Sequence, residues 1–130
     1  MTPFGLFLES LRRSRQLQQV QLADRLEVNS CYVSAMEKGK KGPPSKAVLE
    51  KLIDKLNLNS SEQELLWERV EQSKRTVRLP DNATAEEYVL MNEIQHHLGA
   101  LSSEQIDIIR KILMLGANFK AQQRVEVRSF

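Results

Sequence analysis

The sequence of 130 residues predicts an all-α fold, with five helices in its first part and a helical hairpin in its second. Apolar residues recur at spacings of three and four through almost every segment, which is the period of a helix that buries one face. No run alternates polar and apolar residues for long enough to indicate a β-strand. Capping residues and Gly/Pro breaks separate the periodic segments, so each helix can be given approximate bounds.

Three short helices are predicted within the first 38 residues. Thr2 and Pro3 supply a cap followed by proline, which starts a helix at about residue 3. A second helix is expected over residues 18–26, and Asn29 is a strong cap for a third over residues 30–38. The residues expected to face the core are Phe4, Phe7, Leu8, Leu11, Leu22, Ala23, Leu26, Val33 and Met36.

Two further helices are predicted after the Gly/Pro-rich break at residues 39–44. The fourth is expected over residues 45–56, and the fifth from about residue 60 to residue 75, where Ser60 with Gln63 fits a capping box. Their inner faces are expected to hold Val48, Leu49, Leu52, Ile53, Leu56, Leu65, Leu66 and Val70. Residues 1–75 are therefore expected to form one domain.

A second helical unit is predicted after a linker at residues 76–83, which is poor in apolar residues. Thr84 caps one helix of this unit, and Ser102 with Gln105 opens another that Gly116 is expected to end. The hairpin is thus placed at residues 84–117. Residues 118–130, which close with Phe130, lack periodicity and are expected to be a frayed tail.

Composition and charge narrow the class of protein. A single cysteine excludes an internal disulfide framework and suits the reducing cytoplasm, where we expect the protein to act. No apolar run approaches the roughly 20 residues of a membrane span, and no signal peptide is evident, so no membrane association is expected. Residues 1–58 hold ten Lys/Arg against six Asp/Glu, whereas residues 59–130 hold nine against eleven. A basic first half suits a polyanion, although an ordinary surface can also show so small a difference.

Residues 17–39 predict two short helices joined by a tight turn, the arrangement that places a helix in the major groove of DNA. Ala23 allows the two helices to cross closely, and Val28 fills the turn. With Val33 and Met36 facing inward, the positions left outside or at the edge are Ser30, Cys31, Ser34, Ala35 and Lys38. Mostly small side chains suit a helix that enters a groove about 12 Å wide.

This segment resembles the Xre-type family of helix-turn-helix regulators, which includes phage repressors and Cro proteins. The matching residues are Leu17, Gln19, Leu22, Ala23, Leu26, Val28, Tyr32, Val33, Ser34, Glu37, Gly39 and Pro43. The resemblance covers about residues 4–58. It implies a repressor-like DNA-binding domain, with the helix at residues 60–75 as its fifth helix.

The resemblance also implies roles for individual residues. The residues that would reach base edges are Ser30, Cys31, Tyr32 and Ala35. Those that would contact DNA phosphates are Gln19, Arg12, Ser34, Lys38, Lys40 and Lys41. Arg12 and Glu37 would form a structural pair between the first and third helices, and the alternative is an ordinary surface pair. For Lys40 and Lys41, the alternative to phosphate contact is a solvated loop.

The sequence departs from the family pattern at three positions and at its base-reading face. Glu27 replaces a glycine in the turn, Gln18 replaces a Thr or Ser cap, and Pro44 replaces a serine. A left-handed conformation at Glu27 would cost about 1 kcal/mol, so a looser turn is expected. Because the base-facing side chains are short, we expect selectivity to depend on Tyr32, on DNA shape and on half-site spacing.

Other chemistries find little support in the sequence. Cys31, near a helix start, fits a redox switch or simply a small residue facing a groove, and we favour the second interpretation. His96 and His97 would point about 100° apart on a helix, so no metal site is expected. Glu86 and Glu87 fit a helix first turn. No glycine-rich phosphate loop or nucleophile elbow is present, so we expect neither a cofactor nor an enzyme.

The apolar face of the hairpin is wide enough to need a partner. It either packs within one chain or completes a two-fold dimer, and we favour the dimer because so small a hairpin cannot bury it alone. The residues assigned to dimerisation are Tyr88, Met91, Ile94, Leu98, Ile106, Ile109, Ile112 and Leu113. The sequence thus predicts a homodimeric repressor that binds double-stranded DNA at a palindromic operator. The alternative is an antitoxin-like or adaptor module whose hairpin binds another protein.

Overall fold

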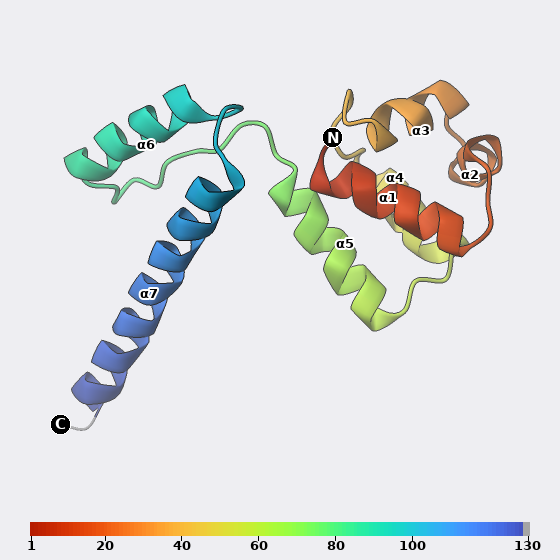
Figure 1. The fold of residues 1–130 in the computed structure, drawn as a ribbon. Helices are drawn as coiled ribbons and strands as arrows, with labels where there is room; N and C mark the ends of the chain where they lie inside the picture. The colour runs from red at the N-terminus through yellow and green to blue at the C-terminus, as the bar shows by residue number, and fades with distance from the viewer. Residues whose placement is uncertain (129–130) are drawn as a thin grey trace. The chain divides into compact units, whose positions relative to one another are not determined.

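The computed structural model describes the backbone of residues 1–128 and the side chains of residues 1–115 (Figure 1). Every regular element in the described backbone is an α-helix, so the predicted all-α fold class is confirmed. The chain divides into two compact units, residues 1–78 and 79–130. The division falls inside the segment predicted to be a linker.

The first unit contains five helices, each within a few residues of its predicted bounds. They are α1 (Pro3–Ser14), α2 (Gln19–Leu26), α3 (Ser30–Glu37), α4 (Lys46–Lys55) and α5 (Ser60–Gln72). Thr2 caps α1 by accepting the N–H of Gly5, and Asn29 caps α3 by accepting the N–H of Cys31. These local hydrogen bonds fix where the helices begin, because each side chain satisfies a backbone donor that the helix itself leaves free.

The start of α5 differs from the prediction. Asn59 is the N-cap, and its side chain accepts the N–H of Glu62 at 2.8 Å while Glu62 accepts the N–H of Asn59 at 3.1 Å. The capping box predicted for Ser60 and Gln63 is therefore wrong by one residue. Glu62 also pairs with Arg15 through two contacts of 2.9 Å, so a contact from α1 favours this register.

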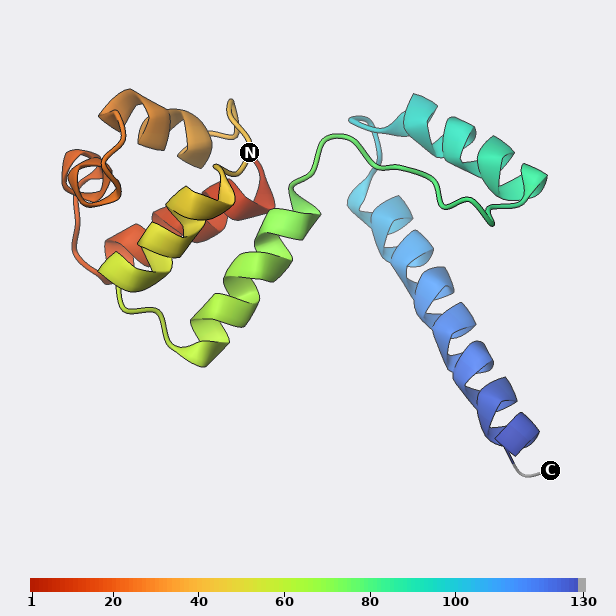
Figure 2. The same ribbon diagram turned by 180° about the vertical axis from the view of Figure 1, so that it is seen from behind.

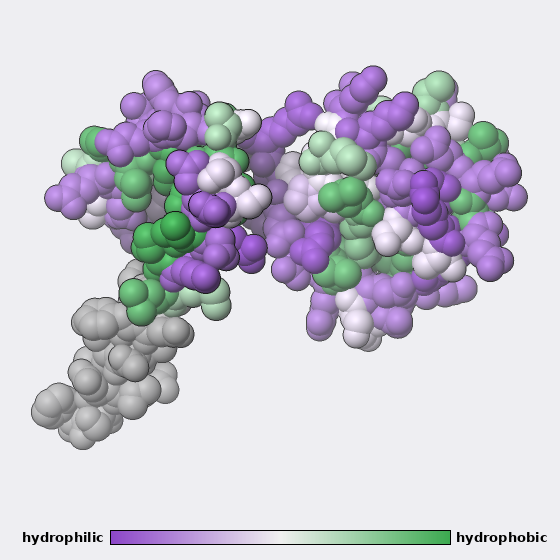
Figure 3. All heavy atoms as spheres, in the orientation of Figure 1, coloured by the Kyte–Doolittle hydropathy of each residue, from purple (hydrophilic) through white to green (hydrophobic). Residues whose placement is uncertain are grey.

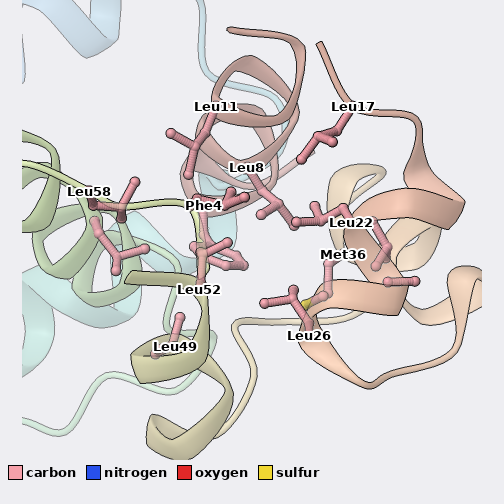
Figure 4. Packing of buried hydrophobic residues seen from close by; sticks show 14 residues of the cluster. Phe4, Leu8, Leu11, Leu17, Leu22, Leu26, Met36, Leu49, Leu52 and Leu58 are labelled. Atoms are coloured by element: carbon pink, nitrogen blue, oxygen red, sulfur yellow. The ribbon is translucent and has the colours of Figure 1, made fainter. Parts of the chain in front are cut away.

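The core of the first unit lies where α1 packs against α3 and α5, and α2 packs against α3 and α4 (Figures 1 and 2). Figure 4 shows hydrophobic side chains from α1, α2, α3 and α4 converging around Phe4. The buried apolar residues are Phe4, Leu8, Leu11, Leu17, Leu22, Ala23, Leu26, Val33, Met36, Leu49, Leu52, Leu56, Leu58 and Leu66. Most were expected from periodicity, but Leu17 and Leu58 lie in connections between helices, where no helical period marks them.

Helices α1 and α3 approach each other very closely at Gly5. A Cβ atom at this position would lie 2.5 Å from the carbonyl oxygen of Met36 and 3.0 Å from that of Glu37. Any other residue would push the two backbones apart. Gly5 therefore sets the depth at which the end of α3 rests on the start of α1.

Three connections turn through residues that are not glycine. Gln16, Glu27 and Asn57 have φ values of 56°, 57° and 50°. The looser turn expected at Glu27 is thus wrong: the residue adopts the left-handed conformation, and the Val28 N–H still donates to the Ala23 carbonyl at 3.0 Å. Lys51 of α4 donates to the Glu27 carboxylate at 2.7 Å and holds this side chain in place.

The second unit contains α6 (Ala85–His97) and α7 (Ser103–Arg128), joined by a short turn. Thr84 and Ser102 cap them as expected. The expectation that Gly116 ends the last helix is wrong, because α7 continues to Arg128; residues 118–128 are helical, and Phe130 lies outside the described residues. None of the described side chains of this unit is buried.

Candidate nucleic-acid interface

Helix α3 is anchored on the core by one face only. Val33 and Met36 are 0% and 1% exposed, which fixes the rotation of the helix about its axis. At the start of α2, the backbone N–H of Gln18 donates to Oε1 of Gln21 at 2.8 Å. Both helices of the predicted helix-turn-helix are therefore capped and oriented by local contacts.

The predicted base-reading residues are not equally accessible. Cys31 is exposed, whereas Ser30, Tyr32 and Ala35 are half-buried, as is Ser34, which was assigned to phosphate contact. Tyr32 packs against the hydrophobic core. Its ring thus has a structural role besides any contact with a base.

Glu37 is the centre of a buried polar network that joins the first three helices. Its side chain is 3% exposed and accepts hydrogen bonds from Arg12 Nε at 2.8 Å and Arg12 Nη2 at 3.0 Å. Gln19 Nε2 donates to the same carboxylate at 3.1 Å. The hydrogen bond to Glu37 raises the pKa of Arg12, although burial acts in the opposite direction.

The network gives Arg12 a positioning role and leaves Gln19 available. Arg12 Nη1 also donates to the Leu17 carbonyl at 2.8 Å, and only 12% of the arginine side chain is exposed. Most of its donors are therefore used inside the protein. Gln19 is half-buried and uses one amide N–H for Glu37, so its other N–H is free in this network to meet a phosphate at the start of α2.

The loop after α3 carries a concentration of positive charge. Lys38, Lys40 and Lys41 are exposed, and within the described part of the chain none of their ammonium groups pairs with a carboxylate. The N–H groups of Lys40 and Lys41 both donate to the Ala35 carbonyl, at 2.9 and 3.2 Å. The loop backbone is therefore folded back on the end of α3, with the lysines beside the predicted reading helix.

The described residues contain no group of three or more His, Cys, Asp or Glu side chains able to hold a metal ion. Nor is any of their helices both long and apolar enough to cross a lipid bilayer.

Two long-range contacts in this unit were not predicted from the sequence. The Arg15–Glu62 pair fixes α5 to the end of α1, and Arg75 Nη2 donates to the Gly39 carbonyl at 2.7 Å. The partners are 47 and 36 residues apart in the sequence. No spacing rule links residues so distant, so only the folded chain reveals these pairs.

Comparisons with known proteins agree with this arrangement. Residues 3–66 match the family model described as a helix-turn-helix domain. An uncharacterized HTH-type transcriptional regulator, RghRB of Bacillus subtilis (strain 168), is 44% identical over 52 residues, which cover 40% of this chain and 37% of that protein. The match thus spans little more than a third of that relative.

Among solved structures, a chain of the SinR protein/SinI protein complex aligns over 91% of this chain and 98% of its own length, at 21% identity and a TM-score of 0.43. The family match falls on the unit that contains α2 and α3. Residues 3–66 therefore form a helix-turn-helix domain similar to those of HTH-type transcriptional regulators.

Proposed function

We propose that this chain is a sequence-specific DNA-binding regulator that acts as a dimeric repressor. The observation that carries the proposal is the anchoring of α3. One face of the helix is buried, its end is tied to α1 and α2 through Glu37, and three exposed lysines lie at or just after its end. A helix held in this way can enter the major groove as a rigid body. The adjacent lysines supply affinity for the phosphate backbone.

In the proposed complex the contacts divide into two kinds. Base edges are contacted by Ser30, Cys31, Tyr32 and Ala35, whereas phosphates are contacted by Gln19, Ser34, Lys38, Lys40 and Lys41. Arg12 is better described as a residue that positions α3 than as a phosphate ligand, since most of its donors are engaged with Glu37 and Leu17. Because none of the base-facing residues is a long amide or a guanidinium, DNA shape should carry much of the selectivity.

The second unit supports the proposal of a homodimer. On α6 and α7 the assigned residues Tyr88, Leu98, Ile106, Ile112 and Leu113 are between 45% and 68% exposed, and Figure 3 shows hydrophobic side chains gathered over this unit. Helices α6 and α7 also border an open groove of about 420 Å³, lined mainly by aliphatic side chains such as Leu90, Ile94 and Ile109. A second copy of the unit would cover this surface and align two copies of α3 with a palindromic operator. Such a dimer, acting in the cytoplasm, would repress by blocking polymerase.

Binding to the DNA upstream of its own gene, measured by mobility shift over a range of salt concentrations, tests the proposal. Gln19→Ala should weaken binding to all sequences about equally, because it removes a phosphate contact. Tyr32→Phe keeps the packing of the ring and removes only its hydroxyl, so it should reduce discrimination between duplexes without unfolding the domain. If both variants bind and discriminate as the unmodified protein does, α3 is not the reading helix.

A partner protein is the second candidate occupant of the α6–α7 surface, because an exposed apolar face also fits an adaptor or antitoxin-like module. Sedimentation of Ile112→Ser against Arg110→Ser distinguishes the two, since both residues are exposed on α7 and only the first is apolar. A homodimer should dissociate in the first variant alone. A purified chain that is already monomeric at micromolar concentration would favour the adaptor.

A further inference from the structure

Arg75 reaches back from beyond the end of α5 to the loop that follows α3. Its Nη2 atom donates to the Gly39 carbonyl at 2.7 Å, across 36 residues of sequence. Its neighbour Lys74 is instead paired with Glu71 on α5, at 2.7 Å. Arg75 is thus directed at the loop, whereas Lys74 pairs back onto α5.

The loop that Arg75 contacts has little freedom to adopt another path. Gly39 has a φ of 80°, and a Cβ atom there would lie 2.8 Å from the Cα atom of Met1. On its other side, the N–H groups of Lys40 and Lys41 are bound to the Ala35 carbonyl. The hydrogen bond from Arg75 therefore adds a contact from outside α3 to a loop whose backbone is already hydrogen-bonded to α3.

A guanidinium is well suited to this position. It lies just past the carboxyl end of α3, where carbonyl groups lack helical partners and a positive charge is favoured. A charge-assisted hydrogen bond is also stronger than a neutral one. The contact brings the Arg75 guanidinium close to Lys40 and Lys41, and repulsion between these cations opposes the contact. Because the hydrogen bond nevertheless forms, positive charge is concentrated at the edge of α3.

We propose that Arg75 is a positioning residue for DNA binding, which holds the loop at residues 38–41 so that Lys40 and Lys41 meet the phosphate backbone. The inference rests on the proposed DNA-binding function and extends the interface beyond the helix-turn-helix. Since Arg75 lies in the segment that leads out of the first unit, this segment and the phosphate-contacting loop are mechanically linked.

Arg78 provides a matched control. It lies three residues further along the same segment, is exposed, and makes no hydrogen bond or ion pair with the described residues. Arg75→Ala and Arg78→Ala therefore remove the same charge, but only the first removes a contact with the loop. Any difference between them reports the contact.

The first measurement is amide hydrogen exchange in the full chain without DNA. Arg75→Ala should speed exchange of the Lys40 and Lys41 amides by about tenfold, the effect of losing one charge-assisted hydrogen bond, whereas Arg78→Ala should leave it unchanged. Equal exchange in the two variants would overturn the inference before any DNA is added.

The second measurement is DNA affinity in a double-mutant cycle with Lys40→Ala/Lys41→Ala. In the parent protein, Arg75→Ala should weaken DNA binding about tenfold. When both lysines are absent, Arg75→Ala should weaken binding no more than Arg78→Ala does, since Arg75 acts through Lys40 and Lys41. If Arg75→Ala still weakens DNA binding about tenfold in the variant that lacks both lysines, and lowers the slope of log affinity against log salt by about one, Arg75 contacts a phosphate directly. That result would refute the positioning role. Failure of the unmodified chain to bind any duplex would instead refute the proposed function, and the exchange data would separate the two results.

Discussion

Replacement of Glu37 by glutamine tests the buried network that orients α3. The substitution keeps the shape of the side chain but removes the charge that faces Arg12, and it places an amide among the donors of Arg12 and Gln19. Helix α3 should remain formed, since its cap and its buried apolar face do not change. The expected loss is in the contacts that join α3 to α1 and α2.

The magnitude follows from the burial of the pair. Breaking a buried ion pair by removing one partner costs about 3–5 kcal/mol, because the remaining charge is left without compensation. Arg12 is 12% exposed and keeps its bond to the Leu17 carbonyl. We therefore expect a loss at the lower end, about 3 kcal/mol, which lowers the urea midpoint of a small domain by roughly 2–3 M.

The assay is urea unfolding followed by the fluorescence of Trp67, which lies on α5 and so reports on the first unit. Glu71→Gln is the control, because it breaks the exposed pair with Lys74 and should leave the midpoint in place. A loss below about 1 kcal/mol for Glu37→Gln would refute the reasoning, since that is the range of solvent-screened pairs.

A paired replacement separates stability from DNA binding. Arg12→Met combined with Glu37→Leu removes both charges, and it should recover most of the stability that the single change loses. DNA affinity should not recover, because Gln19 then has no carboxylate to hold its amide at the start of α2. Recovery of both properties would show that the network serves the fold alone.

Three further changes follow from other contacts. Gly5→Ala places a Cβ 2.5 Å from a backbone carbonyl oxygen of α3, so it should lower the free energy of unfolding, measured by thermal denaturation, by about 2 kcal/mol or more. The control Gly42→Ala, with no atom within 4 Å of its Cβ, should have little effect in the same measurement. Hydrogen bonds from Arg15 and from a backbone N–H lower the pKa of Glu62, so its stabilising contribution is present above the ordinary pKa of 4.5 and is lost as the pH falls toward the folded value. Glu62→Gln should accordingly destabilise the domain at pH 7, and its urea midpoint should converge with that of the unmodified protein in acid; a constant gap across the range would contradict this. Gln16→Gly should stabilise by about 1 kcal/mol in calorimetry by relieving a left-handed conformation, and Gln16→Ala, which keeps the strain, should not.

Much of the fold could be predicted because its signals are local. The caps at Thr2, Asn29, Thr84 and Ser102 act within three residues, and helical periodicity spans only a few turns. The errors lie where local signals compete. Asn59 and Ser60 are both good caps, and the choice of Asn59 agrees with the pairing of Glu62 with a distant arginine.

At two other positions, local propensity alone did not decide the conformation. Glycine favours the end of a helix, yet α7 passes through Gly116, since one glycine costs a helix only about 1 kcal/mol. Glu27 adopts the left-handed conformation that glycine usually supplies, with Lys51 holding its carboxylate. At both positions the sequence correctly indicated a residue that is unfavourable for one conformation of the backbone, but it did not indicate that the backbone adopts this conformation there.

The sequence by itself determined most of the helix bounds and caps, most of the core and the type of domain, because each of these depends on residues a few positions apart. Only the tertiary structure decided which residues distant in the sequence hold these helices together. Glu37 meets Arg12 across 25 residues, Gly39 meets Arg75 across 36, and Phe4 meets Ser73 across 69. Such contacts form only after the helices have packed, and their geometry is set by close approaches such as that at Gly5, which no local pattern in the sequence encodes.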